Sequence, residues 1–160
     1  VLDLGCGSGL LGLMLLRSRP DMDGLEVFAV EGDRSLARVA SDNVAKMGLS
    51  SRMSVRACHS TRLAALPGGS RAALVISELF DSALLGESVL PTLRHAAEHL
   101  LTPGYRSVPS RARIHGVVVE SEFLRGLQGL SSAASRMPFF PPDWRSDSGD
   151  ARPHEVNLNR

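Results

Sequence analysis

The first nine residues, VLDLGCGSG, constrain the fold more than any other part of the chain. A short apolar run leads into a loop with three glycines, and an apolar helical pattern begins at Leu10. This order predicts a strand, a tight loop and a helix. Glycines allow close backbone approach to a ligand, and the N-terminus of a helix attracts negative charge. The segment therefore predicts a nucleotide-binding α/β arrangement.

Strand and helix patterns alternate over the following hundred residues. The expected strands are 1–4, 25–31, 52–58 and 72–76, and the expected helices are 10–19, 34–47 and 89–101, the last ended by TPGY. Asp33 should cap the N-terminus of the second helix and Gly48 its C-terminus. Alternating strands and helices require parallel crossovers, so the sequence predicts a doubly wound, Rossmann-like α/β sheet.

The texture of the chain changes near Ser107, where alternating residues and proline-rich stretches replace the helical patterns. We expect a core over residues 1–106 and the start of a separate β-rich unit over 107–160. Because the chain opens inside a core strand, we expect it to lack an N-terminal portion. IHGVVV and MPFFPP should then be partly exposed, leaving these 160 residues poorly active and marginally stable.

Composition excludes several classes of function. The net charge is +1, so no global basic field favours nucleic acid. No apolar run approaches the ~20 residues that span a bilayer. Cys6 and Cys58 have no paired spacing and are expected to be free thiols. The histidines lack metal-ligand context, so no metal site is predicted.

The glycine loop could bind a dinucleotide or a different nucleotide-like cofactor. Gly7, Gly9 and Gly12 fit G-x-G-x-x-G, but the register is wrong because the first glycine after the strand is Gly5. Asp3 suits a cation better than a pyrophosphate. S-adenosylmethionine carries an ammonium and a sulfonium, and it is therefore the expected cofactor. The loop residues expected to bind it are Asp3, Gly5, Cys6, Gly7 and Gly9.

Two further strand ends should complete the cofactor site. Glu31 ends the second strand, where an acidic residue can accept hydrogen bonds from ribose hydroxyls. The third strand ends at CHST, and a backbone amide or hydroxyl of His59 or Ser60 could contact the adenine. Glu31 or His59 could instead be an ordinary surface residue. The glycine loop lies at the right distance from Glu31, which favours the binding role for Glu31.

SELFDSALLGES, residues 77–88, follows the fourth strand and places two glutamates near the expected methyl group. Glu78 and Glu87 can face each other across the loop between them. Two facing carboxylates repel, and a guanidinium relieves this because it is planar, permanently charged and able to pair bidentately with each. The pair predicts a clamp that binds arginine and leaves electron density on the attacking nitrogen. Surface charge would be the better interpretation without a methyl-donor fold.

These motifs together resemble the protein arginine methyltransferase family. VLDLGCGSGLLG resembles its first motif, VFAVEGD its acidic motif and SELFDSALLGES its double-glutamate loop, in the version of the type III branch. The resemblance implies a class I S-adenosylmethionine-dependent methyltransferase core followed by a β-barrel. It also implies monomethylation of arginine in proteins such as histones and RNA-binding proteins, a dimer or pseudo-dimer, and a location in cytoplasm and nucleus.

Asp81 adds a third carboxylate to this loop, where most of the family has glycine. It could attract a second basic residue of the substrate, which would favour peptides with Arg-x-Arg spacing. A solvated acid or a loop cap is the alternative interpretation, and the substrate role is favoured because the methyl-accepting peptide must pass over this rim.

Three other functions remain open on the sequence. The chain could be a catalytically silent scaffold, or it could methylate a small molecule or nucleic acid. SELFD lacks the Asn/Asp-Pro-Pro-aromatic motif usual in nucleic-acid amino-methyltransferases. An NAD-dependent dehydrogenase is disfavoured by the register of the glycines.

Overall fold

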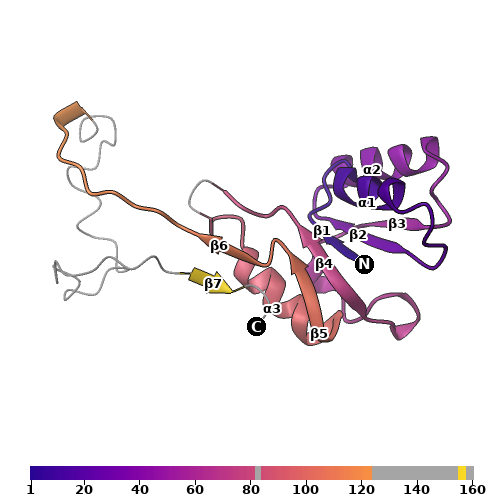
Figure 1. Cartoon of the computed structure of the whole chain (residues 1–160). Coiled ribbons are helices and arrows are strands. Elements are labelled where there is room, and N and C mark those ends of the chain that lie inside the picture. Colours follow the sequence, from indigo (N-terminus) through magenta and orange to yellow (C-terminus); the bar gives the residue numbers. More distant parts are fainter. Residues whose placement is uncertain (82–83, 124–154, 158–160) are drawn as a thin grey trace. The chain divides into compact units, whose positions relative to one another are not determined.

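The structure, a computed structural model, describes residues 1–81 and 84–123 and the backbone of 155–157. The chain divides into two units, one of Val1–Ala112 with Glu155–Arg160 and the other of Arg113–His154. The first unit contains the parallel sheet and its three helices, and Figure 1 shows the order of these elements along the chain.

The sheet has five parallel strands in the order β3-β2-β1-β4-β5. They are β1 (Leu2–Leu4), β2 (Val27–Glu31), β3 (Met53–Ala57), β4 (Ala72–Ser77) and β5 (Leu101–Val108). The chain moves outward from β1 to β3 and then crosses to β4 on the other side of β1. Ligands of open α/β sheets bind outside the carboxyl ends of the strands at such a reversal.

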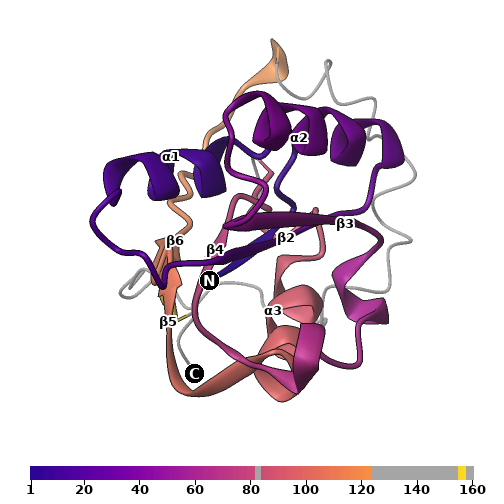
Figure 2. The same cartoon turned by 90° about the vertical axis from the view of Figure 1, so that its right-hand side faces the viewer.

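The helices cover both faces of the sheet. Figure 2 shows α1 (Leu10–Ser18) and α2 (Arg34–Lys46) on one face and α3 (Val89–His99) on the other. Two short 3₁₀ turns, η1 (Ser60–Arg62) and η2 (Pro67–Gly69), precede β4. Leu13 and Leu16 of α1 and Ala40 of α2 pack against one face of the sheet. Leu93 and Ala96 of α3 pack against the other face. The predicted alternation of strands and helices is confirmed.

Both caps predicted for the second helix are present. The Asp33 carboxylate Oδ1 accepts hydrogen bonds from the N–H groups of Ser35 and Leu36 at 2.8 and 2.9 Å. Gly48 follows the last turn with φ +68° and donates its N–H to Ala45 O at 3.0 Å. These bonds satisfy backbone groups that a helix leaves unpaired at its ends.

The prediction for residues 100–105 is wrong. TPGY does not merely end a helix: it lies within β5, which begins at Leu101, directly after α3. Pro103 and Gly104 suggested a turn, but β5 is an edge strand whose pairing with β4 shifts register between Ala72 and Leu74. Proline and glycine are tolerated at edges and bulges because the N–H that proline lacks is not needed there.

The β-rich unit predicted for 107–160 lies largely outside the described residues, as does MPFFPP. β6 (Arg111–Arg113) pairs with β7 (Glu155–Asn157) in a two-stranded sheet. The predicted boundary at 106/107 falls within β5. Val117 and Val118 of IHGVVV are 84% and 100% exposed. No helix in the described part of the chain is both long enough and apolar enough to cross a membrane.

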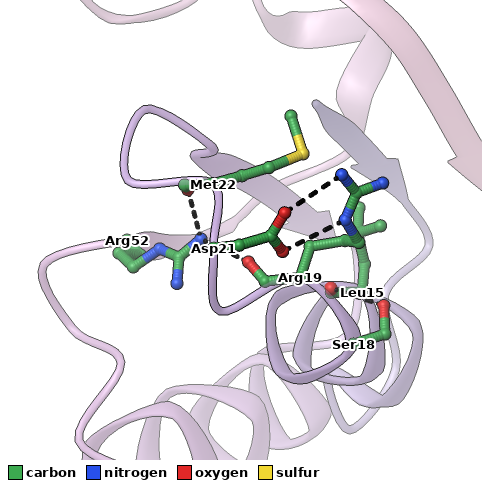
Figure 3. Close-up of polar contacts among 6 residues, drawn as sticks. All are labelled: Leu15, Ser18, Arg19, Asp21, Met22 and Arg52. Carbon is green, nitrogen blue, oxygen red and sulfur yellow. Dashed lines mark hydrogen bonds and ion pairs between the residues drawn. The ribbon is translucent and has the colours of Figure 1, made fainter.

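Arg52 joins the loop after α1 to the start of β3. Its guanidinium donates to the carbonyl oxygens of Met22 at 2.8 Å, Leu25 at 3.2 Å and Arg19 at 3.4 Å, and Figure 3 shows the bond to Met22. Arg19 also pairs with Asp21 at 3.3 Å. One planar fork therefore satisfies three carbonyl groups that belong to no helix or strand.

Replacing Arg52 with Ala should lower the free energy of unfolding by about 1.5–3 kcal/mol, because three hydrogen bonds from a charged donor are lost. Urea denaturation measures the change. Arg38→Ala removes the same charge from the exposed face of α2 and serves as the control. Equal loss in both variants would contradict the assigned role of Arg52.

Candidate active site

The glycine loop is tied to the neighbouring strand by its backbone. The N–H groups of Gly5 and Cys6 both donate to Val30 O, at 2.9 and 3.1 Å, and Gly9 donates to Cys6 O at 2.7 Å. Gly5 has φ +67°, and a Cβ there would lie 2.5 Å from Leu79 Cδ2. Glycine suits this position because its φ lies in the left-handed region and because a Cβ would force the side chain of Leu79, in the loop that follows β4, to move.

Glu31 connects the glycine loop to the start of the second helix. Its Oε2 accepts the Gly7 N–H at 2.8 Å, and its Oε1 accepts the Asp33 N–H, also at 2.8 Å. Each carboxylate oxygen keeps further acceptor capacity. The half-buried side chain therefore holds two loops in place and can still accept hydrogen bonds from a ligand.

Asp3 is a fully buried carboxyl group at the centre of β1. Its Oδ2 accepts the Gly12 N–H at 3.1 Å, whereas its Oδ1 has no hydrogen-bond partner among the described residues. Burial raises the pKa of Asp3 to about 6, the Gly12 bond opposes the shift, and the Glu31 charge adds to it. An incompletely paired buried carboxylate is stabilised by a nearby cation.

Cys6 lies in the same loop as a buried free thiol. Burial, with the charges of Asp3 and Glu31, raises its pKa to about 12. The thiol therefore stays protonated at neutral pH and is not a nucleophile. Cys6 stabilises the loop through its backbone, which bonds to Val30 and Gly9.

A cavity of about 360 Å³ lies at the carboxyl ends of the strands. Ligand sites commonly have this size and this place in the fold. The predicted site residues that line it are Gly5, Gly7, Glu31, His59, Ser60, Glu78 and Glu87. The cavity thus brings together the glycine loop, the acidic end of β2 and both glutamates.

Four predicted site residues do not line this cavity. They are Asp3, Cys6, Gly9 and Asp81. Asp3 accepts the Gly12 N–H of α1, and Gly9, at the end of the loop, lies against Ala40 of α2. Their predicted contacts with a ligand, like the substrate contact of Asp81, stay predictions.

The sequence analysis missed several residues that line the cavity, among them Leu36, Leu79 and Thr92. Leu79 could have been found, because the residue after Glu78 must lie at the same strand end. Leu36 and Thr92 are helical residues with no chemical pattern to mark them, and only the packing of α2 and α3 brings them to the cavity.

The two glutamates enter the cavity from opposite ends of one loop. Leu79 and Phe80 pack against the core after β4 and anchor the beginning of the loop. Ser88 precedes α3, and its carbonyl accepts the Thr92 N–H at 3.1 Å, which anchors the end. Glu78 and Glu87 are exposed, and among the described residues neither forms an ion pair. Both carboxylates can therefore receive a cationic group.

A larger cavity, of about 530 Å³, lies at the amino ends of the strands and is lined by Val1, Val27, Met53 and Ala72 among others. Its arginines are engaged with backbone: Arg52 holds the loop described above, and Arg71 donates to Leu101 O at 2.8 Å. We assign the site to the smaller cavity, because only there do acidic side chains converge on a glycine loop. The described residues contain no group of three or more potential metal ligands.

Solved structures support the class of fold. The chain aligns with a protein arginine methyltransferase enzyme–prozyme complex from Trypanosoma brucei with a TM-score of 0.65 and 24% identity, over 78% of this chain and 37% of that one. It aligns with protein arginine methyltransferase 10 of Arabidopsis thaliana with a TM-score of 0.60 and 29% identity, over 70% and 30%. The fold is that of the class I S-adenosylmethionine-dependent methyltransferases, as predicted.

The curated relatives of this chain are named as arginine methyltransferases. The chain is 38% identical to protein arginine N-methyltransferase 7 of Danio rerio over 127 residues, which is 78% of this chain and 18% of that protein. It is 37% identical to an arginine N(omega)-methyltransferase of Streptomyces achromogenes subsp. streptozoticus over 134 residues, or 83% and 36%. No protein-family model matches. In sequence and fold the chain is thus similar to protein arginine N-methyltransferases, protein arginine N-methyltransferase 7 among them, over a minor part of those proteins' length.

The burial of Asp3 predicts a particular pH dependence of stability. Between about pH 4 and pH 6 the unfolded chain has released this proton while the folded chain still holds it, so stability falls as pH rises. The loss is complete above pH 6 and amounts to about 3 kcal/mol, at 1.36 kcal/mol per pKa unit. Asp3→Asn should remove this slope. Urea unfolding of both proteins from pH 4 to 7, without ligand, tests it, and parallel stability curves would contradict the prediction.

Proposed function

We propose that this chain carries the S-adenosylmethionine site and the catalytic glutamates of an arginine N-methyltransferase. The observation that carries the proposal is the single cavity lined by the glycine loop, Glu31, Glu78 and Glu87. The chain spans only 18% of the zebrafish relative, so its similarity to that protein supports the proposal and does not replace a test.

The residues of the cavity fit S-adenosylmethionine. Glu31 can accept hydrogen bonds from ribose hydroxyls, and His59 and Ser60 lie at the end of β3, where the adenine would be. Asp3 keeps a buried oxygen without a partner, which suits the cationic end of the ligand. When bound, S-adenosylmethionine supplies a methyl group on a positively charged sulfur.

Glu78 and Glu87 would hold the guanidinium that accepts the methyl group. Two carboxylates around one guanidinium satisfy its planar N–H donors and restrict its rotation. Positioning and electrostatics of this kind supply most of the rate enhancement in displacement reactions. Because the remaining nitrogen is not bound by a carboxylate, it keeps the electron density needed for attack.

Glu31→Ala should weaken binding of S-adenosylhomocysteine roughly 10- to 100-fold, since hydrogen bonds to a charged acceptor contribute about 1.5–3 kcal/mol. Calorimetry on the full chain measures the affinity. Glu26→Ala removes an acid from the opposite end of the same strand and is the matched control. An affinity unchanged by Glu31→Ala would exclude this cofactor site.

Glu78→Gln and Glu87→Gln should each lower the rate of methyl transfer at least about 100-fold, because one carboxylate of the clamp is lost. Affinity for S-adenosylhomocysteine should stay within a factor of two, and Glu26→Gln should change neither quantity. Single-turnover assays with an arginine peptide measure the rate. If both variants kept wild-type rates, the arginine assignment would be overturned; a wild-type chain that binds the cofactor without transferring methyl groups would favour a silent scaffold.

A small-molecule substrate is the second candidate. It is favoured by the 37% identity to a bacterial protein named arginine N(omega)-methyltransferase, of which the chain covers 36%. Rates with free L-arginine and with an arginine peptide, measured side by side, separate the two candidates. A preference for the peptide supports the protein-directed activity, and a preference for the free amino acid overturns it.

We further propose monomethylation, with histones and RNA-binding proteins as substrates, in the cytoplasm and nucleus. The resemblance of SELFDSALLGES to the type III branch supports monomethylation, and that resemblance also implies the substrates and the location. Mass spectrometry of the product gives the number of methyl groups on each arginine. Microscopy of the tagged full chain gives its location, and exclusion from either compartment would contradict the last statement.

We also propose a dimer or pseudo-dimer. Leu10 and Met14 of α1 are 59% and 60% exposed, and Leu11 between them is 41% exposed. An apolar helix face of this kind gains stability when a second surface covers it. Sedimentation of the full chain tests the proposal, and Met14→Lys should shift the equilibrium toward the monomer.

A further inference from the structure

The loop that carries the two glutamates closes on itself through one side chain. Asp81 Oδ1 accepts the N–H of Gly86 at 3.0 Å, and the backbone carbonyl of the same aspartate accepts the N–H of Leu84 at 2.9 Å. These two bonds join the first part of the loop, just after Glu78, to the part just before Glu87. This hydrogen-bonded ring therefore limits the distance between the part of the loop that follows Glu78 and the part that precedes Glu87.

Gly86 is fitted to this ring. A Cβ at Gly86 would overlap Asp81 Oδ2. The carboxylate thus lies directly against the glycine backbone, and no other residue can occupy position 86 without displacing it. A displaced Asp81 carboxylate would lose its bond to the Gly86 N–H. Since Glu87 is the next residue, its backbone would then move as well.

The backbone around the ring is strained. Leu84 and Ser88 have φ of +70° and +60°, in the left-handed region that residues with a side chain disfavour. Such conformations persist only where surrounding interactions hold them, and they often occur at functional sites. Among the described residues, this part of the loop is held on one side of Glu87 by the bond from Gly86 to Asp81. It is held on the other side by the bond from Thr92 to Ser88 at the start of α3.

Asp81 itself does not line the cavity that Glu78 and Glu87 share. Its side chain is half-buried within the loop, with one oxygen bonded to Gly86. This placement favours an indirect role over contact with a group bound in the cavity.

We propose that Asp81 is a positioning residue, which holds Glu87 opposite Glu78 by accepting the Gly86 N–H. This inference rests on the proposed arginine clamp. What matters is the acceptor oxygen of Asp81 and not its charge, because an amide oxygen in the same place accepts the same bond.

Two substitutions at position 81 separate acceptance from charge. Asp81→Asn keeps an acceptor oxygen, and Asp81→Ala removes it. We expect kcat for an arginine peptide to stay within threefold of wild type in Asp81→Asn and to fall at least tenfold in Asp81→Ala. Affinity for S-adenosylhomocysteine should be unchanged in both. Asp42→Ala, which removes an exposed carboxylate from α2, should leave kcat unchanged.

Hydrogen exchange of the Gly86 amide reports on the bond without requiring activity. Exchange should be at least tenfold faster in Asp81→Ala than in wild type, and protection should be kept in Asp81→Asn. A wild-type chain that transfers no methyl group would overturn the proposed function, and the exchange rates would then decide by themselves whether Asp81 holds the loop.

A second residue provides an independent variant if Asp81→Ala does not fold. Gly86→Ala should lower kcat as Asp81→Ala does, because the added methyl group displaces the carboxylate. The double variant should be no worse than either single variant, since both break the same contact. Equal impairment of Asp81→Asn and Asp81→Ala, additive effects of the two positions, or Gly86 exchange that ignores Asp81→Ala would each overturn the proposal.

Discussion

The pairing of β1 with β4 is the constraint on which the site depends. Leu4 of β1 lies opposite Ser77 of β4, so the residues that follow these two strands emerge side by side. One strand is followed by the glycine loop and the other by Glu78 and Leu79. The contact between Leu79 and Gly5 is a direct result, and a Cβ at Gly5 would force the Leu79 side chain to move. The glycine loop and the loop after β4 are thereby built as one packed unit.

Charge is arranged around this unit in two different ways. Asp3 is buried, has one oxygen with no hydrogen-bond partner among the described residues, and holds its proton to about pH 6, so its ionised form is unfavourable unless a cation lies nearby. Glu78 and Glu87 are exposed. Under the proposed function, the buried acid contributes to affinity for the cofactor, and the exposed pair contributes to selection of a guanidinium. The same sheet edge would thus serve two cationic partners through carboxylates in different surroundings.

The loop from Glu78 to Glu87 is anchored at its described ends without regular structure. Leu79 and Phe80 fix its beginning by packing, and the bond from Gly86 to Asp81 fixes the part before Glu87. The proposed clamp needs such anchoring, because a misplacement of about 1 Å can cost a factor of 100 in rate. Asp81, which the sequence suggested for substrate contact, also forms a hydrogen bond within the loop, and the variants at position 81 distinguish these roles.

Local sequence determined much of this protein. Glycines after a strand, Asp33 before a helix and apolar runs of four to seven residues predicted β1 to β4, all three helices and the acidic ends of the strands, since these depend on neighbours along the chain. Tertiary structure alone decided the rest. β5 was missed because proline and glycine are tolerated only by virtue of its place at the edge of the sheet. Leu36 and Thr92 line the cavity because packing between distant segments of the chain places α2 and α3 beside it. That information is absent from the order of residues around each position.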